Sequence, residues 1–224
     1  SAPTRLLVVD DHPVVMEGLT RLLGREPDLN VAWVATGISD ALDICSRNRP
    51  DLAIVDLALQ DGSGLDLIRV LHDRMPDLPI LVMSMYEASL YAERVLRAGA
   101  RGYITKHLAP RGVVEAIRRV RDTGDIYIDE GSITGLHRRP AEAVPAEGTD
   151  EFARGHMRYL SDRELEVFDL IGRGLRKRDI AGRLNLSTNT IETHRASIKK
   201  KLKLRSAAEL SRFAFLQVSA GADN

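Results

Sequence analysis

The sequence predicts two domains of different class: an α/β domain with a five-stranded parallel sheet, followed by an all-α domain of four helices. The first 130 residues alternate short apolar runs with amphipathic stretches, which is typical of a doubly wound sheet. From Tyr159 onward no strand pattern appears, and helical spacing dominates. The residues between are rich in Gly, Pro, Ala and charge, as linkers are. We therefore expect domains at 1–130 and 156–224, joined by a linker at 131–155.

The predicted strands are short, nearly continuous apolar runs, as expected for strands buried on both faces. We expect the flavodoxin-like strand order 2-1-3-4-5, in which the first and third strands are neighbours. In chain order the predicted strands are 5–9, 31–36, 52–55, 80–84 and 102–105.

The predicted helices of this domain lie between the strands, where apolar residues recur at helical spacing. Leu65, Ile68 and Leu71 lie three apart and therefore share one helix face. We predict helices at 13–24, 39–48, 64–74, 88–98 and 110–123.

The charge of the chain is divided between its ends, although the total of 32 basic and 32 acidic residues gives a net charge of zero. Residues 1–130 carry a balance of −5, and residues 156–224 carry +6. A basic C-terminal part favours a polyanionic partner. No apolar run reaches the roughly 18 residues of a membrane span, and the lone Cys45 suits a reducing compartment, so we expect a cytoplasmic protein.

Three carboxylates stand at the ends of predicted strands. Asp10 and Asp11 directly follow the first strand, and Asp56 directly follows the third. The ligand crevice of such a sheet lies beyond the carboxyl ends of its strands, where strand order reverses, so we expect the three acids to converge. Like charges about 4 Å apart repel by about 4 kcal/mol at an effective dielectric constant near 20. The acids therefore require a cation, and hard carboxylate oxygens suit Mg²⁺.

Ser84 ends the fourth predicted strand, and Lys106 directly follows the fifth. A hydroxyl and an ammonium group at the same rim are able to bind the oxygens of a phosphoryl group. The metal ion and Lys106 would neutralise charge while Asp56 attacks in line.

Residues 4–124 resemble a response-regulator receiver domain. The matching segments are Val8-Val9-Asp10-Asp11-His12, Asp51-Leu52-Ala53-Ile54-Val55-Asp56-Leu57, Ser84 and Gly102-Tyr103-Ile104-Thr105-Lys106. The resemblance implies that Asp56 is the phosphoacceptor. It implies that Asp11, Asp56 and the backbone carbonyl of Ala58 bind Mg²⁺, with Asp10 assisting through water. It also implies a switch pair, in which the Ser84 hydroxyl moves toward the phosphoryl group and the Tyr103 ring turns inward.

The C-terminal domain is predicted to contain helices at 162–172, 176–184, 188–202 and 206–217. Ser161 is a favourable N-cap with Glu164 at the capping-box position, and the third helix begins after a turn at 185–187. On the third helix, Ile191, His194, Ile198 and Leu202 are spaced to face inward.

The outward face of the third helix is basic and carries hydroxyl groups, which suits the major groove of DNA. Lys199 and Lys200 are expected to contact phosphate, and Glu192 either accepts from a cytosine amino group or faces solvent. The predicted DNA-binding residues are Thr188, Asn189, Glu192, Thr193, Arg195, Ala196, Lys199 and Lys200.

This segment resembles the LuxR-type helix-turn-helix, and the whole chain resembles NarL/FixJ response regulators. The resemblance implies a regulator of transcription, not a turnover enzyme, that receives phosphate from a sensor histidine kinase and slowly hydrolyses it. It also implies a homodimer on paired DNA half-sites. The implied dimer contacts are Ala207, Leu210, Ser211 and Ala214.

Three other interpretations remain open at this level. The first is a DNA-binding regulator whose receiver works without phosphorylation. The second is an aspartyl phosphatase, which would usually need a second acid two residues after the nucleophile; position 58 is Ala58. The third is an RNA-binding adaptor, although the chain lacks the aromatic platforms typical of single-strand binders.

Overall fold

The computed structural model describes residues 2–59, 61–86, 88–108, 110–129 and 148–220. The chain forms two compact units, Ser1–Gly135 and Leu136–Asn224, which we describe separately. Most of the predicted linker lies outside the described residues. Its last part, however, belongs to helix α7 (Asp150–His156), which begins at the N-cap Thr149. No helix among the described residues has the length and hydropathy of a membrane span.

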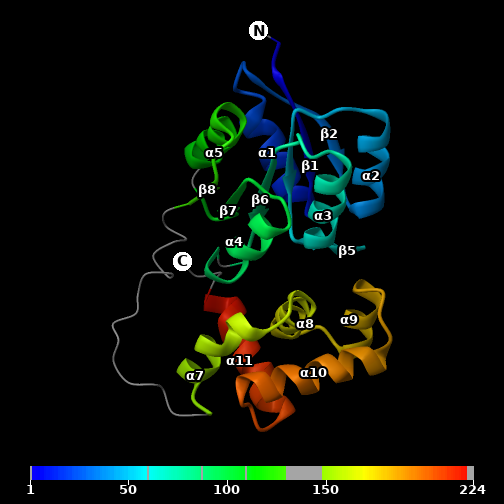
Figure 1. Cartoon of the computed structure of the whole chain (residues 1–224), viewed down its shortest axis with the longest axis vertical. Helices are drawn as coiled ribbons and strands as arrows, with labels where there is room; N and C mark the ends of the chain where they lie inside the picture. Colours follow the sequence, from blue (N-terminus) through cyan, green and yellow to red (C-terminus); the bar gives the residue numbers. More distant parts are fainter. Residues whose placement is uncertain (1, 60, 87, 109, 130–147, 221–224) are drawn as a thin grey trace. The chain divides into compact units, whose positions relative to one another are not determined.

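The N-terminal unit is built on a parallel sheet in the order β2-β1-β3-β6-β7-β8 (Figure 1). Its first five strands in this order are the five predicted ones, and the predicted order of these five is confirmed. The strands are β1 (Thr4–Val9), β2 (Leu29–Ala35), β3 (Leu52–Val55), β6 (Ile80–Ser84), β7 (Gly102–Thr105) and β8 (Tyr127–Ile128).

The main sheet has six strands among the described residues, one more than the five predicted. The two-residue strand β8 pairs with β7 in parallel as a sixth strand. A separate hairpin forms from β4 (Ala58–Leu59) and β5 (Gly62–Ser63). Each of these strands has only two residues, which is too short to produce a recognisable alternation in the sequence.

Helices cover both faces of the sheet. Figure 1 shows α1 (Pro13–Leu23) and α5 (Pro110–Thr123) together on one side, and α2 (Ile38–Arg47) and α3 (Gly64–Arg74) together on the other. Helix α4 (Ala88–Arg97) packs on β7. Alternate strand residues fill the two interfaces, because successive side chains of a strand point to opposite faces. The core on the α1 and α5 side includes Leu6, Val8, Ile54, Leu81, Ile104, Val113 and Ile117.

Every regular element described in the C-terminal unit is a helix. After α7 come a short 3₁₀ turn (Met157–Tyr159), α8 (Asp162–Gly172), α9 (Lys177–Arg183), α10 (Thr188–Leu202) and α11 (Ala207–Ala220). The predicted capping box is present, since the Ser161 side chain accepts from the Glu164 N–H and the Glu164 side chain accepts from the Ser161 N–H. Ser187 caps α10, and Asn185 in the preceding turn has a positive φ of 52°. These local signals explain why the predicted helices and the observed ones agree within a few residues.

Candidate functional site

The sheet brings the predicted acidic residues together at one edge. β1 and β3 are paired neighbours, and the Asp56 N–H donates to the Val9 carbonyl just beyond their last pair. Asp10 and Asp56 therefore leave adjacent strands at the same level, as the sequence predicts. Both side chains are buried, with exposed fractions of 1% and 2%.

Lys106 reaches this pocket from the end of β7. Its Nζ lies 2.6 Å from Asp10 Oδ2 and 2.8 Å from Asp56 Oδ2, and its side chain is only 5% exposed. The ammonium group therefore offsets part of the repulsion between the two carboxylates. This contact spans 50 residues of sequence and places the lysine where the prediction requires it.

Burial raises the pKa of the Asp56 carboxyl above its ordinary value, although the neighbouring Lys106 charge and hydrogen bond act in the opposite direction. The Oδ1 atom of Asp56 is buried and has no hydrogen-bond partner among the described residues. A buried carboxylate oxygen without a partner is costly and calls for a cation or a donor.

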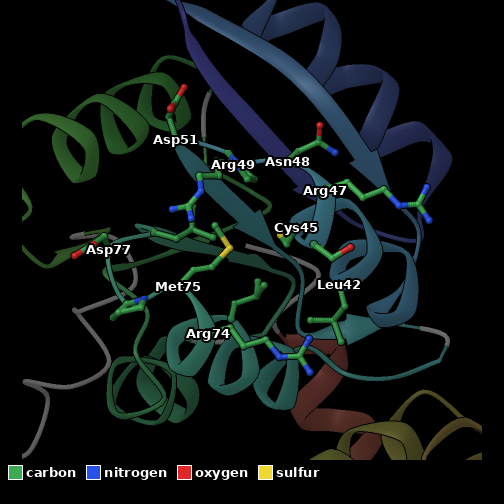
Figure 2. Close-up of a pocket in the computed structure, with 14 residues that line it drawn as sticks. Leu42, Cys45, Arg47, Asn48, Arg49, Asp51, Arg74, Met75 and Asp77 are labelled. Atoms are coloured by element: carbon green, nitrogen blue, oxygen red, sulfur yellow. The ribbon is translucent and has the colours of Figure 1, made fainter.

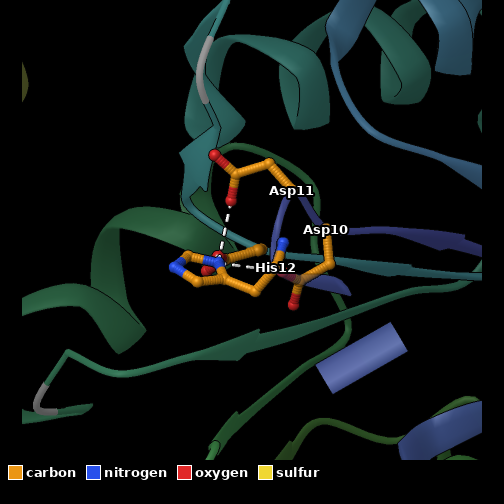
Figure 3. A group of neighbouring side chains, drawn as sticks. Asp10, Asp11 and His12 are labelled. Carbon is orange, nitrogen blue, oxygen red and sulfur yellow. Dashed lines mark hydrogen bonds and ion pairs between the residues drawn. The ribbon is translucent and has the colours of Figure 1, made fainter. Parts of the chain in front are cut away.

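The pocket has the donor set of a divalent-cation site. Single ligand atoms of Asp10, Asp11, His12 and Asp56 all lie within 4.8 Å of one another. Figure 3 shows Asp10, Asp11 and His12 side by side. Three of these donors are carboxylates, which match the oxygen preference of Mg²⁺. The residues therefore fit the ion that the sequence predicts. The Ala58 backbone lies close enough to the Asp56 carboxyl to lower its pKa, and ligation by the Ala58 carbonyl stays a prediction.

The ring of His12, a residue without a predicted role, lies among the acids. His12 Nδ1 is 2.8 Å from Asp11 Oδ1, 3.1 Å from Asp10 Oδ1 and 3.9 Å from Asp56 Oδ2. The position of His12 directly after the acidic pair was the only available signal.

Gly64, the first residue of α3, lets the chain pass tightly against the acceptor loop. A Cβ at this position would overlap the backbone carbonyl of Asp56 and approach Leu57 Cα to 2.7 Å. The preceding Ser63 caps the helix by accepting from the Leu65 N–H. The start of α3 therefore supports the backbone that carries Asp56.

The two residues of the predicted switch pair both contact the backbone of Tyr86. Ser84 is fully buried, and its Oγ accepts from the Tyr86 N–H at 3.4 Å. Tyr103 is also fully buried, and its hydroxyl donates to the Tyr86 carbonyl at 2.8 Å. The Tyr103 ring is therefore already inside in this structure, and Tyr86 is a connection that sequence reasoning missed.

In the C-terminal unit, α10 separates into an inner and an outer face. Ile191, Ile198 and Leu202 are fully buried, while His194, predicted to face inward, is only half-buried. Of the predicted DNA-binding residues, Asn189, Glu192, Thr193, Ala196 and Lys200 are exposed, and Thr188, Arg195 and Lys199 are half-buried. The outer face is therefore accessible along most of the helix. Glu192 also lies 3.5 Å from Lys177 Nζ of α9.

Glu164 attaches this helix to α8, beyond its role in the capping box. Its carboxylate accepts from Ser197 Oγ and from Lys201 Nζ, each at 2.6 Å. Burial raises the pKa of Glu164, but the hydrogen bonds from Lys201, Ser197 and the Ser161 backbone outweigh it and lower the pKa to about 2. The ammonium group of Lys201 is therefore occupied by an ion pair within its own unit.

The predicted dimer contacts on α11 require a correction. Leu210 and Ala214 are fully buried in the core of their own unit, and a side chain without exposed surface does not contact a second molecule. Ala207 and Ser211 are exposed, as is Phe215 on the same helix. The error arose because the helical spacing of α11 does not show which face the other helices cover.

A three-layered α/β unit with an acidic pocket, in one chain with a helix-turn-helix unit, is typical of DNA-binding regulators that carry a receiver domain. Comparison with known families agrees with this class. Residues 6–118 match the response regulator receiver domain, and residues 158–214 match the bacterial regulatory proteins of the luxR family. The chain belongs to the two-component response regulators that combine a receiver with a LuxR-type DNA-binding domain. Response regulators with these two domains are generally non-enzymatic.

Curated relatives extend over nearly the whole chain. The oxygen regulatory protein NreC of Staphylococcus carnosus is 35% identical, covering 94% of this chain and 96% of its own. NreC of Staphylococcus aureus strain JH9 is 33% identical with the same coverage. Among solved structures, RcsB of Salmonella typhimurium has a TM-score of 0.73 at 22% identity, covering 97% of this chain and 99% of its own, which shows a shared fold.

Proposed function

We propose that Asp56 accepts a phosphoryl group from a sensor histidine kinase and that this modification controls DNA binding by the C-terminal unit. The observation that carries the proposal is the position of Lys106, 2.8 Å from the buried Asp56 carboxylate. An ammonium group at this place is able to bind the phosphoryl oxygens as the carboxylate oxygen attacks phosphorus. The bond from phosphorus to the donor nitrogen breaks, and the donor histidine keeps the electron pair.

We assign the cation site to Asp11, Asp56 and the Ala58 carbonyl, with Asp10 acting through water. When bound there, Mg²⁺ would neutralise negative charge on the acids and the phosphoryl group. Asp56 Oδ1, which has no hydrogen-bond partner in the part of the chain that the structure describes, supports this assignment. Slow hydrolysis of the acyl phosphate, with no external substrate, completes the cycle.

The switch connects the pocket to the Tyr86 loop. Ser84 lies at the end of β6, and its Oγ contacts the Tyr86 backbone that Tyr103 also holds. If the Ser84 hydroxyl turns toward a phosphoryl oxygen, it leaves the Tyr86 N–H and loosens one of the two contacts. Shifting the equilibrium between the two states of the switch from 1:99 to 99:1 requires about 5.5 kcal/mol of differential stabilisation.

For DNA, we propose that the outer face of α10 enters the major groove. The exposure of polar side chains on this face supports the placement, as seen for Asn189, Thr193 and Lys200. Two copies, joined through the exposed part of α11 around Ala207 and Ser211, would read half-sites about 10 bp apart.

One observation favours the alternative of a phosphorylation-independent receiver. The Tyr103 ring is buried, its hydroxyl donates to the Tyr86 carbonyl, and a receiver of this alternative kind would keep the ring there at all times. In that case the receiver would hold the arrangement expected of the modified state, and DNA binding would not respond to phosphate.

The deciding experiment treats the full chain with beryllofluoride and Mg²⁺ and then measures particle size and duplex-DNA affinity. We expect wild type to respond and Asp56→Asn to be inert. Asp66→Asn removes an exposed carboxylate that pairs with Arg69, outside the pocket, and is the matched control. An equal response of Asp56→Asn and wild type would exclude Asp56 as the acceptor, and a wild type whose DNA affinity ignores beryllofluoride would favour the alternative.

A further inference from the structure

The ring of His12 occupies a corner of the acidic pocket. Its Nδ1 lies 2.8 Å from Asp11 Oδ1 and 3.1 Å from Asp10 Oδ1, whereas Lys106 contacts the other oxygen of Asp10. Figure 3 shows the ring beside the two carboxylates. The two contacts place an imidazole nitrogen against the same carboxylates that are proposed to hold the cation.

These separations agree with a shared ion. An octahedral ion with ligands at about 2.1 Å has neighbouring ligand atoms about 3.0 Å apart and opposite ones about 4.2 Å apart. The 2.8 Å distance from His12 Nδ1 to Asp11 Oδ1 is close to the first value, and its 3.9 Å distance to Asp56 Oδ2 is close to the second. The buried Asp56 Oδ1, which has no partner among the described residues, independently indicates a ligand at this site.

The backbone restricts where the ring can go. His12 is the N-cap residue of α1, in extended conformation, and Pro13 follows it at the start of the helix. Its N–H donates to Asp10 Oδ1 at 2.9 Å, so main chain and ring both contact the same carboxylate. Only two side-chain torsions remain, and the side chain is still 47% exposed, which leaves the ring open to water and ions.

We propose that His12 is a ligand of the cation site and determines its metal selectivity. Coordination uses the Nδ1 lone pair, and the ring then carries its proton on Nε2. Imidazole is a good ligand for Co²⁺, Ni²⁺ and Zn²⁺, whereas Mg²⁺ prefers oxygen and keeps its waters. The site therefore binds borderline transition metals through His12 in addition to the acids, and Mg²⁺ through the acids alone. This inference rests on the proposed cation site.

The test is calorimetric titration of the full chain with Mg²⁺ and, separately, with Co²⁺, in the absence of any phosphoryl donor. We expect His12→Ala to weaken Co²⁺ binding about tenfold or more, because even residues that only support a ligand often have effects of 10- to 100-fold. Its effect on Mg²⁺ should stay below about threefold. His107→Ala, an exposed histidine directly after Lys106, is the matched control and should change neither affinity.

A spectroscopic measurement on wild type makes the result independent of the variant's folding. Coordination of His12 to Co²⁺ gives an exchangeable imidazole N–H proton with a strongly shifted NMR signal, which is lost in His12→Ala. Equal weakening of both metals, or no change for Co²⁺, would overturn the inference while leaving the cation site intact. If wild type binds neither ion, the cation part of the proposed function fails as well.

Discussion

The carboxylate of Glu164 and the ammonium group of Lys201 lie 2.6 Å apart and join α8 to α10. The carboxylate is nearly buried, and it also accepts from Ser197 and from the Ser161 backbone. One acidic residue therefore caps one helix and positions the helix whose outer face is proposed to bind DNA. This arrangement separates Lys201, which serves the fold, from the neighbouring Lys200, which is exposed.

Glu164→Gln should lower the free energy of unfolding of the C-terminal unit by about 1–3 kcal/mol, because it removes charged hydrogen bonds at a buried site while keeping a capping side chain. The folded pKa of about 2 lies below the ordinary 4.5. The stabilisation is therefore present above pH 4.5 and disappears as the pH falls toward 2. Thermal unfolding between pH 2 and 7 measures this, with Glu166→Gln, which pairs with Arg163 on the same helix, as control. Parallel pH curves for wild type and Glu164→Gln would contradict the assignment.

Lys200→Ala should weaken binding to duplex DNA of any sequence and reduce the slope of log affinity against log salt by about 1, because one phosphate contact is lost. Lys201→Ala should instead lower the melting temperature, since it leaves the Glu164 carboxylate without its charged partner. Fluorescence anisotropy over a salt series and thermal unfolding distinguish the two. Equal salt slopes for Lys200→Ala and wild type would remove Lys200 from the DNA contacts.

Lys106→Met should abolish the beryllofluoride response and, at the same time, strengthen Mg²⁺ binding. The ammonium group now offsets charge on Asp10 and Asp56, so its loss leaves a more negative pocket for the cation. The stabilisation by Mg²⁺ follows RT ln(1 + [L]/Kd) and is read as a shift in melting temperature. Lys203→Met, an exposed lysine in the other unit, is the control. Weaker Mg²⁺ binding by the variant would show that Lys106 supports the cation and does not compete with it.

Gly64→Ala should destabilise the N-terminal unit by about 1–3 kcal/mol and reduce the beryllofluoride response, because the new methyl group overlaps the Asp56 carbonyl. Gly18→Ala makes the same chemical change inside α1, where a Cβ meets nothing within 4 Å. That control should be stabilised by about 0.5–1 kcal/mol. Urea unfolding measures both effects. A Gly64→Ala protein as stable as wild type would show that the loop carrying Asp56 shifts to accommodate the methyl group without loss of stability.

Ser211→Glu should prevent the dimer that we propose to form on phosphorylation, and it should leave the fold intact because Ser211 is exposed on α11. Leu210→Ala should instead cost about 2–5 kcal/mol of stability, as expected for a fully buried leucine. Sedimentation with and without beryllofluoride, together with thermal unfolding, separates these results. A dimer that persists in Ser211→Glu would place the interface elsewhere.

The sequence by itself determined the order of the five central strands, the helices between them and the capped helices of the C-terminal unit. These features follow from local signals: apolar periods, N-cap residues and turn residues all act within a few positions. It also determined that Asp10, Asp56 and Lys106 would meet, because parallel strands bring their carboxyl ends to one edge.

Only the tertiary structure decided which atoms share contacts. Three contacts depend on distances of a few ångströms that local patterns do not encode. They are the contacts of His12 with Asp11, of Gly64 with the Asp56 backbone and of Glu164 with Lys201. The burial of Leu210 and Ala214 likewise depends on which face of α11 the other helices cover. Periodicity shows that a helix has an apolar face, but the packing of the neighbouring helices selects the residues that remain exposed.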